Sequence, residues 1–555
     1  MLDGPAALAS PGPAPGFARR HRLFGLALAV GALIRLVAVV GFHPALWFND
    51  SFEYVSVALR PQPYVVRPDG YSFLLLVLRP LHSFTLVVVL QHLMGLAVGT
   101  LVYLLCRRYR LGPWGATAAA LPVLLDGNGI AIEHLVLSDT LFTFLVAAAV
   151  TVLLLPSARG ARPGLGTAAG AGALLAAAIL TRTVGLVIAV VLVVWLLARW
   201  PGWRAFALFV VALAVPVAGY AGWYHSAHGR YGLTGADGAF LYSRTATFAN
   251  CATMHPPADL AYLCPTQPSG HRGPPSDYLW HLNQPLRIDP RPVFGGAKND
   301  DAKRFAELAI RSQPLAYLVA VLRDFARTFE PGMANYPSAG LVDHYRFNAQ
   351  PQPVPGRTFV VGGSAIQDAT AYEHGSPATR LTQPFATVVG HYQRFVTVPG
   401  PALAVLLLAG LAGGTAGARR RRPLARSDRE NGRSPRSRRA EDRPGADAAI
   451  LLSATAFALL VAPPALAGFD YRYIPPSLGF LGAGAAIGLA AWPRSAADAG
   501  GLAVPAQASR TRPGQAPVRT PRSSPAEATA PAEPGRSPGH SERRSPAGRP
   551  PRPIR

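Results

Sequence analysis

Long apolar segments alternate with shorter polar ones along most of this chain, and their lengths suit a lipid bilayer. A helix needs about 20 apolar residues to cross the hydrocarbon core. Ten segments reach or approach this length, although several are short or rich in glycine. They cover residues 23–42, 84–105, 113–132, 140–155, 165–180, 184–198, 205–224, 396–413, 446–467 and 476–492. The pattern predicts an all-α polytopic membrane protein with about ten transmembrane helices.

Two of these segments leave a choice open. The first follows Arg19, Arg20 and Arg22, as the apolar part of a secretory signal would. It is long for a signal and no small-residue cleavage site follows it, so we expect a retained membrane helix. The stretch 165–198 is interrupted at residues 181–183. It forms either two short spans or a re-entrant pair.

The charged residues set the orientation of these spans. Only 15% of the 555 residues are charged, the formal net charge is +24, and the excess is mostly arginine between apolar segments. Basic loops stay on the cytoplasmic side. All the basic clusters fall on one side of the membrane if the spans are counted as above. This predicts a plasma-membrane protein with both termini, residues 1–22 and 493–555, in the cytoplasm.

The segments 418–446 and 493–555 are rich in arginine, proline, serine and glycine, a composition typical of disorder. Aromatic residues, which stack on bases in many single-strand binders, are not interleaved with the arginines. We therefore expect these segments to be solvated topology anchors and not nucleic-acid binding sites.

The same topology places a large segment, 225–395, outside the membrane, between a membrane core at 23–224 and C-terminal helices at 396–492. Its fold is not predicted by any pattern that we find. Residues 302–329 have helical spacing with a kink expected at Pro314. This helix either lies on the membrane surface or forms the core of a small external domain. Cys251 and Cys264 lie in the same oxidising compartment, where a disulfide between them is expected.

The first external loop, 43–83, carries the most promising acids. Asp50 and Glu53 are three residues apart, which places both carboxylates on one face of a helix. A carboxylate at the membrane surface can take the proton of an acceptor hydroxyl. The second can orient the acceptor or share a divalent ion with a phosphate. The structural alternative is that Asp50 caps the helix and Glu53 is a solvated loop acid.

Other polar residues lie on the same predicted side of the membrane. Ionisable residues near membrane depth are costly and are candidates for function. Arginine suits an anionic phosphate because it binds it through two hydrogen bonds. The structural alternatives are helix capping, interfacial snorkelling and pairing within the bundle. The further candidates are Asp139 as a catalytic acid and Arg67, Tyr71, His134, Arg182, Arg472 and Tyr473 as substrate-binding residues.

In order and spacing, these motifs resemble the GT-C class of integral-membrane glycosyltransferases. Within that class, the chain is similar to the dolichyl-phosphate-mannose protein mannosyltransferases and their bacterial relatives. The motifs are Arg35, Asp50-Ser-Phe-Glu53-Tyr54, Pro68-Asp-Gly70-Tyr71, Ser138-Asp139-Thr, Thr181-Arg182-Thr and Tyr471-Arg472-Tyr473. The resemblance is good over residues 23–224 and weak over the last two spans.

The resemblance implies a hexosyl- or pentosyltransferase that uses a polyprenyl-phosphate sugar on the extracytoplasmic face. It implies Asp50 as the catalytic base, Asp139 near the same site and Arg472 near the carrier phosphate. This sequence departs from the commoner family form, in which the two acids are adjacent. The external segment 225–395 has no counterpart that we find, so a glycan, a lipid and a protein all stay open as acceptors.

The alternatives to an enzyme are a transporter or flippase for a lipid-linked substrate and a non-catalytic assembly protein of the cell envelope. Transporters often contain internal repeats with broken helices in matched positions. We find no such repeat, and the acids gather outside the membrane and not at its midplane. The residues do not decide whether a divalent cation takes part, since two carboxylates alone need substrate phosphate to complete a site.

Overall fold

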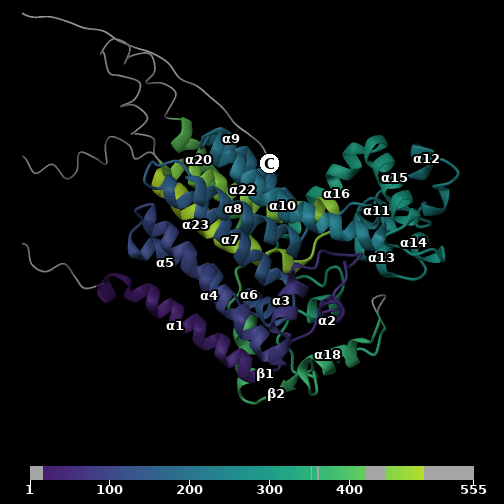
Figure 1. Ribbon diagram of the computed structural model, residues 1–555, viewed down its shortest axis with the longest axis horizontal. Helices are drawn as coiled ribbons and strands as arrows, with labels where there is room; N and C mark the ends of the chain where they lie inside the picture. Colours follow the sequence, from purple (N-terminus) through teal and green to yellow (C-terminus); the bar gives the residue numbers. More distant parts are fainter. Residues whose placement is uncertain (1–16, 352, 359–361, 420–443, 493–555) are drawn as a thin grey trace, which may run out of the picture. The chain divides into compact units, whose positions relative to one another are not determined.

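The computed structural model describes residues 17–351, 353–358, 362–419 and 444–492 (Figure 1). The predicted cytoplasmic arm 1–22 and the predicted disordered segments 418–446 and 493–555 lie outside these residues except at their edges. At those edges residues 17–22, 418–419 and 444–446 continue helices.

Every one of the ten predicted spans is helical in the structure. The predicted all-α polytopic fold is confirmed. Seven of the helices in the described residues are long and apolar enough to cross a membrane by themselves. The membrane helices are α1 (Phe17–Gly41), α4 (Phe84–Arg108), α5 (Pro113–Leu125), α6 (Gly127–His134), α7 (Ser138–Ser157), α8 (Leu165–Thr181), α9 (Gly185–Arg199), α10 (Trp203–His228), α20 (Gly400–Arg419), α22 (Pro444–Leu466) and α23 (Leu478–Ala491).

Three of the predicted spans differ from a straight membrane helix. The span predicted at 113–132 is broken into α5 and α6, which meet at an angle of 48°. Asp126 at the break accepts hydrogen bonds from the backbone N–H groups of Gly129 and Val398, both at 2.7 Å. The helices α8 and α9 have only 17 and 15 residues, and they are separated at Arg182 as the sequence predicted.

The ends of the membrane helices form two groups. At one end, Arg199 of α9 forms an ion pair with Asp447 of α22, and Tyr109 after α4 donates to the carbonyl of Leu154 in α7 at 3.0 Å. At the other end, Arg182 after α8 forms an ion pair with Asp139 at the start of α7. The first group carries the predicted basic clusters and the second the predicted site residues. Which group faces the cytoplasm stays a prediction.

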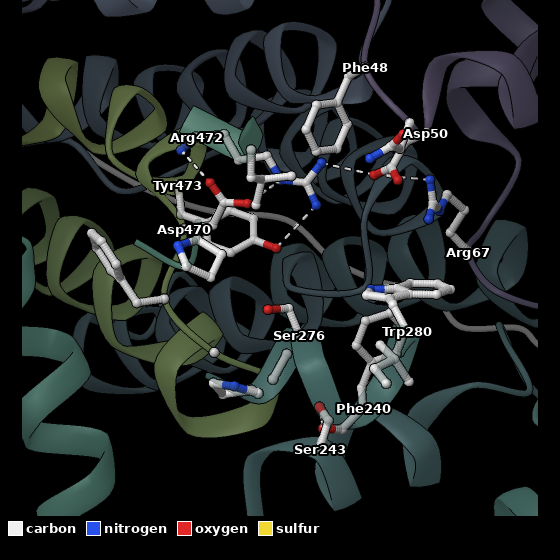
Figure 2. A pocket seen from close by; sticks show the side chains of 18 of the residues that line it. Phe48, Asp50, Arg67, Phe240, Ser243, Ser276, Trp280, Asp470, Arg472 and Tyr473 are labelled. Carbon is white, nitrogen blue, oxygen red and sulfur yellow. Dashed lines mark hydrogen bonds and ion pairs between the residues drawn. The ribbon is translucent and has the colours of Figure 1, made fainter. Parts of the chain in front are cut away.

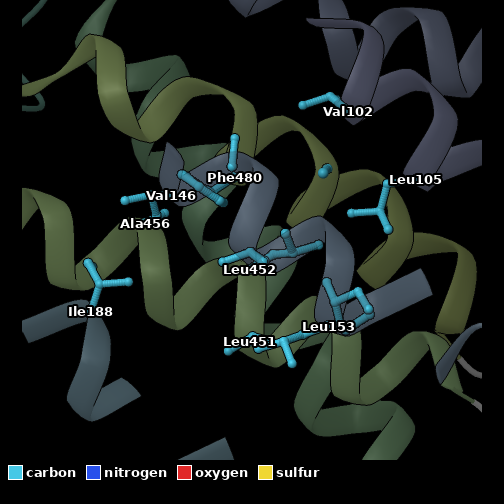
Figure 3. Close-up of a cluster of buried hydrophobic side chains, with 14 of the residues drawn as sticks. Val102, Leu105, Val146, Leu153, Ile188, Leu451, Leu452, Ala456 and Phe480 are labelled. Carbon is cyan, nitrogen blue, oxygen red and sulfur yellow. The ribbon is translucent and has the colours of Figure 1, made fainter. Parts of the chain in front are cut away.

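Buried leucine, valine and alanine side chains fill the space between these helices (Figure 3). Small residues let the C-terminal helices approach one another closely, as is usual where lipid gives no hydrophobic drive for helix association. A Cβ atom at Gly413 of α20 would lie 2.3 Å from the backbone of Gly488 in α23. The identity of both glycines is therefore set by packing.

The first external loop is ordered by contacts with residues far along the chain. It contains α2 (Ser51–Leu59), α3 (Gly70–Leu78) and η1 (Arg79–Leu81). The short strands β1 (Phe42–His43) and β2 (Arg380–Leu381) pair antiparallel. A hydrophobic cluster then joins the loop to α17 (Ala339–Asp343), α18 (Ala365–Glu373) and α19 (Phe385–Phe395). The last third of the segment 225–395 thus packs against the first loop.

The earlier part of that segment has a core of its own. Tyr242, Leu263, Tyr278 and Phe305 are buried together in it. Cys251 and Cys264 are joined by a disulfide at its edge. The elements are α11 (Asp237–Ala246), α12 (Cys251–Met254), η2 (Ala261–Leu263), η3 (Ser269–His271), α13 (Pro275–Trp280), α14 (Pro285–Ile288) and α15 (Ala297–Ser312).

The predicted kink at Pro314 is a sharp turn between two helices. The helices α15 and α16 (Pro314–Arg327) meet at 102°, because proline has no N–H to continue α15. The sequence left open whether residues 302–329 lie on the membrane surface or in an external core, and the two helices differ in this respect. Phe305 of α15 is buried in the external core, whereas α16 lies against α22 and exposes half or more of each of Leu315, Leu318, Val319 and Leu322.

Candidate active site

The carboxylate of Asp50 lies between two arginines from distant parts of the chain. Asp50 occupies the N-cap position of α2, yet its side chain makes no cap hydrogen bond. Instead Arg472 Nη1 donates to Asp50 Oδ2 at 2.8 Å, and Arg67 Nη1 lies 3.0 Å from the same oxygen (Figure 2). The capping alternative therefore does not describe this carboxylate, which is held by the two arginines.

Glu53 is the second acid of this cluster and is not a solvated loop residue. Its side chain is largely buried, and Oε2 lies 3.5 Å from Arg67 Nη1. Oε1 lies 3.7 Å from Arg357 Nη2. The predicted helical spacing holds, because both carboxylates on this face of α2 reach the same guanidinium group of Arg67.

The surroundings shift the pKa values of Asp50 and Glu53 in opposite directions. Burial raises the pKa of a carboxyl group, and nearby positive charge lowers it. Burial of Asp50 acts in the upward direction, but the charges of Arg67 and Arg472 outweigh it and hold the pKa of Asp50 well below its usual range. For Glu53, burial outweighs the attraction of Arg67, and the charge of Asp50 adds to it, so the pKa of Glu53 is raised. Asp50 is thus the stronger acid of the two.

A second pair of predicted residues lies beside the first. Arg182 forms an ion pair with Asp139, which is buried in the first turn of α7. The ring of Tyr473 lies between the two arginine groups: its centroid is 5.4 Å from Cζ of Arg182 and 5.2 Å from Cζ of Arg472. Breaks between helices create this arrangement: Arg182 is the C-cap of α8, and Arg472 lies in the turn between α22 and α23.

Two cavities meet at this cluster. The first, which we call the loop cavity, has a volume of about 470 Å³ and is lined by the first loop, the turn at residues 467–473 and the external segment. The second, the helix cavity, has a volume of about 790 Å³ and extends along α7, α9 and α22. Both are lined by Asp50, Arg67, Phe240, Ala467, Arg472 and Tyr473.

Two predicted substrate-binding residues line neither of these cavities. Tyr71 is fully buried, and its hydroxyl donates to Gln91 Oε1 at 2.7 Å. His134 is buried too, with Nε2 2.8 Å from the carbonyl of Phe42 and Nδ1 3.0 Å from His92 Nε2. Both are corrections to the sequence interpretation, which grouped Tyr71 and His134 with the substrate-binding residues because they lie on the same predicted side of the membrane. Their hydrogen bonds join α3 to α4 and α6 to β1.

The adjoining glycine explains part of the same motif. A Cβ atom at Gly70 would lie 2.5 Å from the carbonyl oxygen of Leu180 at the end of α8. Only glycine allows α3 to begin this close to α8. The contact fixes the loop that carries Arg67.

The sequence interpretation missed the wall that the external segment contributes to the loop cavity. Figure 2 shows Phe240, Ser243, Ser276 and Trp280 across the cavity from Asp50. They come from α11 and α13, and Arg287 of α14 also lines the cavity. No periodic pattern marks these residues, because short helices and turns present them.

A guanidinium group lies between the two acids of the cluster. The position between Asp50 and Glu53 is filled by Nη1 of Arg67, which is within 3.5 Å of both carboxylates. Among the described residues, His, Cys, Asp and Glu side chains form no group of three that could hold a metal ion. The residues present therefore suit an anion bound by arginine better than a cation bound by carboxylates.

No family model and no curated protein matches the chain. Among solved structures, the chain is similar to the protein O-mannosyltransferase Pmt1–Pmt2 complex of S. cerevisiae bound to the sugar donor. That match has 18% identity and a TM-score of 0.31, and covers 41% of this chain and 36% of the other. A second match is the oligosaccharyltransferase AglB of Archaeoglobus fulgidus, in complex with an inhibitory peptide and a dolichol phosphate. It has 12% identity, a TM-score of 0.37 and coverage of 86% and 51%.

A third match is ArnT of Cupriavidus metallidurans bound to undecaprenyl phosphate, with 14% identity, a TM-score of 0.32 and coverage of 84% of this chain and 77% of the other. These structures are glycosyltransferases of the GT-C class, which the sequence motifs resemble. The chain spans about a third and about half of the first two chains it matches.

Proposed function

We propose that the chain is an integral-membrane glycosyltransferase that moves a sugar from a polyprenyl-phosphate donor to an acceptor hydroxyl on the extracytoplasmic face. The observation that carries the proposal is the position of Asp50. Its carboxylate lines both the loop cavity and the helix cavity and contacts Arg67 and Arg472. A transferase must hold two substrates in contact with one reactive group, and Asp50 is so placed.

The helix cavity suits the donor. Val187 of α9 and Leu459 and Leu466 of α22 give it apolar walls, which suit a polyprenyl chain. Arg182 and Arg472 lie at the same cavity and suit the phosphate of the carrier. A lipid-linked sugar bound in this way has its anomeric carbon near Asp50.

In the proposed reaction, the acceptor oxygen attacks the anomeric carbon of the sugar from the face opposite the phosphate. The new C–O bond forms while the bond from that carbon to the phosphate oxygen breaks. The electron pair leaves with the polyprenyl phosphate, whose negative charge the arginines stabilise. The proton of the acceptor hydroxyl goes to Asp50. This single displacement inverts the configuration of the sugar.

Donor binding also changes Asp50 as a base. In the resting site Arg67 and Arg472 keep the pKa of Asp50 low, which makes its carboxylate a weak base. A carrier phosphate that binds the same guanidinium groups offsets their charge. The proton affinity of Asp50 then rises only when the donor is present. In this scheme Glu53 positions Arg67, and Asp139 positions Arg182.

A transfer assay tests the proposal. Membranes that contain the wild-type chain, Asp50→Asn or the control Asp343→Asn are given radiolabelled polyprenyl-phosphate sugars and endogenous acceptors. Asp343 is partly exposed and pairs with Arg346 outside both cavities. We expect transfer by the wild type and the control, and a fall of about a hundredfold or more in Asp50→Asn.

The other outcomes separate the alternatives. Equal transfer by all three chains would keep the enzyme and discard the assigned base. No transfer from any donor would favour the transporter or the envelope assembly protein. Where transfer occurs, the donor that supports it names the sugar.

A further inference from the structure

The loop cavity contains one arginine whose charge is not neutralised by the described part of the chain. Four guanidinium groups and three carboxylates line this cavity. They belong to Arg67, Arg287, Arg357, Arg472, Asp50, Glu53 and Asp470. Arg67, Arg357 and Arg472 each lie within 4 Å of at least one of these acids. The count leaves one formal positive charge, and it is on Arg287.

Arg287 is held at the cavity wall without a partner for its charge. Within the described ranges it forms no ion pair, and its Nε is buried without a hydrogen-bond partner. The side chain as a whole is partly exposed, so the cost falls on the buried Nε, because a buried polar atom without a partner is unfavourable. A bound anion would remove this cost. Arg287 lines the loop cavity but not the helix cavity, so it is not placed for the donor phosphate.

The neighbouring wall offers a flat aromatic face and hydroxyl groups. Trp280 of α13 is 43% exposed although it is a large apolar side chain. Figure 2 shows Trp280 and Ser276 on the side of the cavity opposite Asp50. Aromatic rings suit ligands with one apolar face and a polar edge. A sugar ring has this character, with C–H groups on its faces and hydroxyl groups around its edge.

We propose that the acceptor is a saccharide that carries an anionic group, a phosphate or a carboxylate. In this arrangement Arg287 binds the anion, Trp280 packs on the ring face, and a hydroxyl of the saccharide reaches Asp50. A guanidinium group binds either anion through two parallel hydrogen bonds. This inference rests on the proposed function of the same cavity and names the acceptor class that the transfer reaction would use.

A neutral glycan or an uncharged peptide fits these residues less well, since neither would offset the charge of Arg287. The cavity has apolar lining residues such as Leu279 and Phe469, but an uncharged lipid would likewise leave the charge of Arg287 without a counter-ion. The anionic saccharide satisfies both the charge and the aromatic surface of the wall with one ligand.

Binding of simple probes to the purified full-length chain in lipid nanodiscs tests the inference without requiring transfer. The probes are cellobiose, its terminal carboxylate form and its 6-phosphate, titrated by ligand-observed NMR. We expect one or both anionic probes to bind about tenfold more tightly than cellobiose. The preferred probe tells a carboxylate from a phosphate.

Variants assign that preference to a residue. Arg287→Gln should remove the preference for the anionic probe and leave the affinity for cellobiose unchanged, and Arg287→Lys should restore part of it. Arg291→Gln is the matched control, because Arg291 is four residues away, pairs with Asp289 and lines neither cavity. Trp280→Leu should weaken all three probes alike.

Three outcomes would overturn the inference: equal affinity for charged and neutral probes, an anionic preference that persists in Arg287→Gln, or no binding of any probe. The result is independent of the transfer assay. Transfer that depends on Asp50 without any effect of Arg287 would retain the enzyme and discard the anionic acceptor. Anionic preference without transfer would leave a saccharide-binding site and discard the enzyme.

Discussion

Arg472 Nη1 donates a hydrogen bond to Asp50 Oδ2 at 2.8 Å, although the two residues are 422 positions apart in the chain. Asp50 begins the first external helix, and Arg472 lies in η7 (Tyr471–Tyr473), between the last two membrane helices. The pair forms only when the first and last spans are assembled in one bundle. The proposed base is therefore completed by folding of the whole membrane domain.

Changes at Arg472 should affect donor use. We expect Arg472→Gln to raise the KM for the polyprenyl-phosphate sugar and to lower kcat, with kcat/KM reduced about a hundredfold. Arg472→Lys should retain charge without the two-pronged geometry and be reduced about tenfold. Steady-state transfer kinetics measure this, with Arg346→Gln as the control because Arg346 lines neither cavity. Unchanged kinetics in Arg472→Gln would show that this arginine does not bind the carrier phosphate.

The stability of the protein should depend on pH through Asp69. This carboxyl group is buried and accepts hydrogen bonds from the backbone N–H of Tyr64 at 3.1 Å and the hydroxyl of Tyr220 at 3.0 Å. Burial raises the pKa of Asp69 to about 7. The folded chain therefore retains a proton that the unfolded chain releases near pH 4. This contribution to stability is full below about pH 4 and is lost as the pH rises through about 7.

Thermal unfolding of the detergent-solubilised chain checks this prediction. The apparent Tm should fall between about pH 5 and pH 8 in the wild type, and the fall should be smaller in Asp69→Asn. Asp343→Asn, at a partly exposed site, should keep the wild-type slope. Parallel pH curves for the wild type and Asp69→Asn would contradict a buried, protonated Asp69.

The disulfide should stabilise the external core locally. Cys251 and Cys264 are 13 positions apart and lie beside the cluster around Tyr242 and Leu263. A bridge over a loop of this size contributes about 3 kcal/mol by restricting the unfolded chain. Cys251→Ser should make residues 251–264 sensitive to limited proteolysis while the membrane helices stay protected. Thiol labelling of the untreated chain should be blocked at both positions, and labelling of either would contradict the bridge.

The exposed face of α16 should lie in the bilayer. Tyr317 of this helix donates to the carbonyl of Ala465 in α22 at 3.0 Å, so α16 is joined directly to a membrane helix. Its exposed Leu315, Leu318 and Leu322 are then on the lipid side. Cysteine placed at Leu318 should react with a lipid-soluble probe and resist a water-soluble one, and cysteine at Arg311 of α15 should do the reverse. Equal access of the water-soluble probe to both would favour an external position for α16.

The topology makes a direct prediction about the termini. Fusion of a reporter to the N-terminus or to the C-terminus should give a cytoplasmic signal in both cases, because the basic helix ends belong to one group. A reporter inserted after Gly270, in the external segment, should give the opposite signal. An extracytoplasmic C-terminus would require an odd number of spans and would contradict this topology.

The sequence was sufficient to predict the membrane helices, because the need for apolar residues in lipid acts on every position of a span. It also placed Asp50, Asp139, Arg182 and Arg472 on one side, since each lies where an apolar segment is interrupted. The break at Arg182 and the turn at Pro314 follow from local chemistry in the same way. These features depend on residues close together in the chain.

Only the tertiary structure decided which of these polar residues share a cavity. Asp50 could cap its helix by its local sequence, and the approach of Arg67 and Arg472 is what directs its carboxylate elsewhere. His134 looked equally accessible, but packing of the first loop buries it. The wall that carries Trp280 and Arg287 left no signal in the sequence, because short helices folded around a separate core place it there. Membership of a site is set by contacts between distant segments, and hydrophobic periodicity does not encode these contacts.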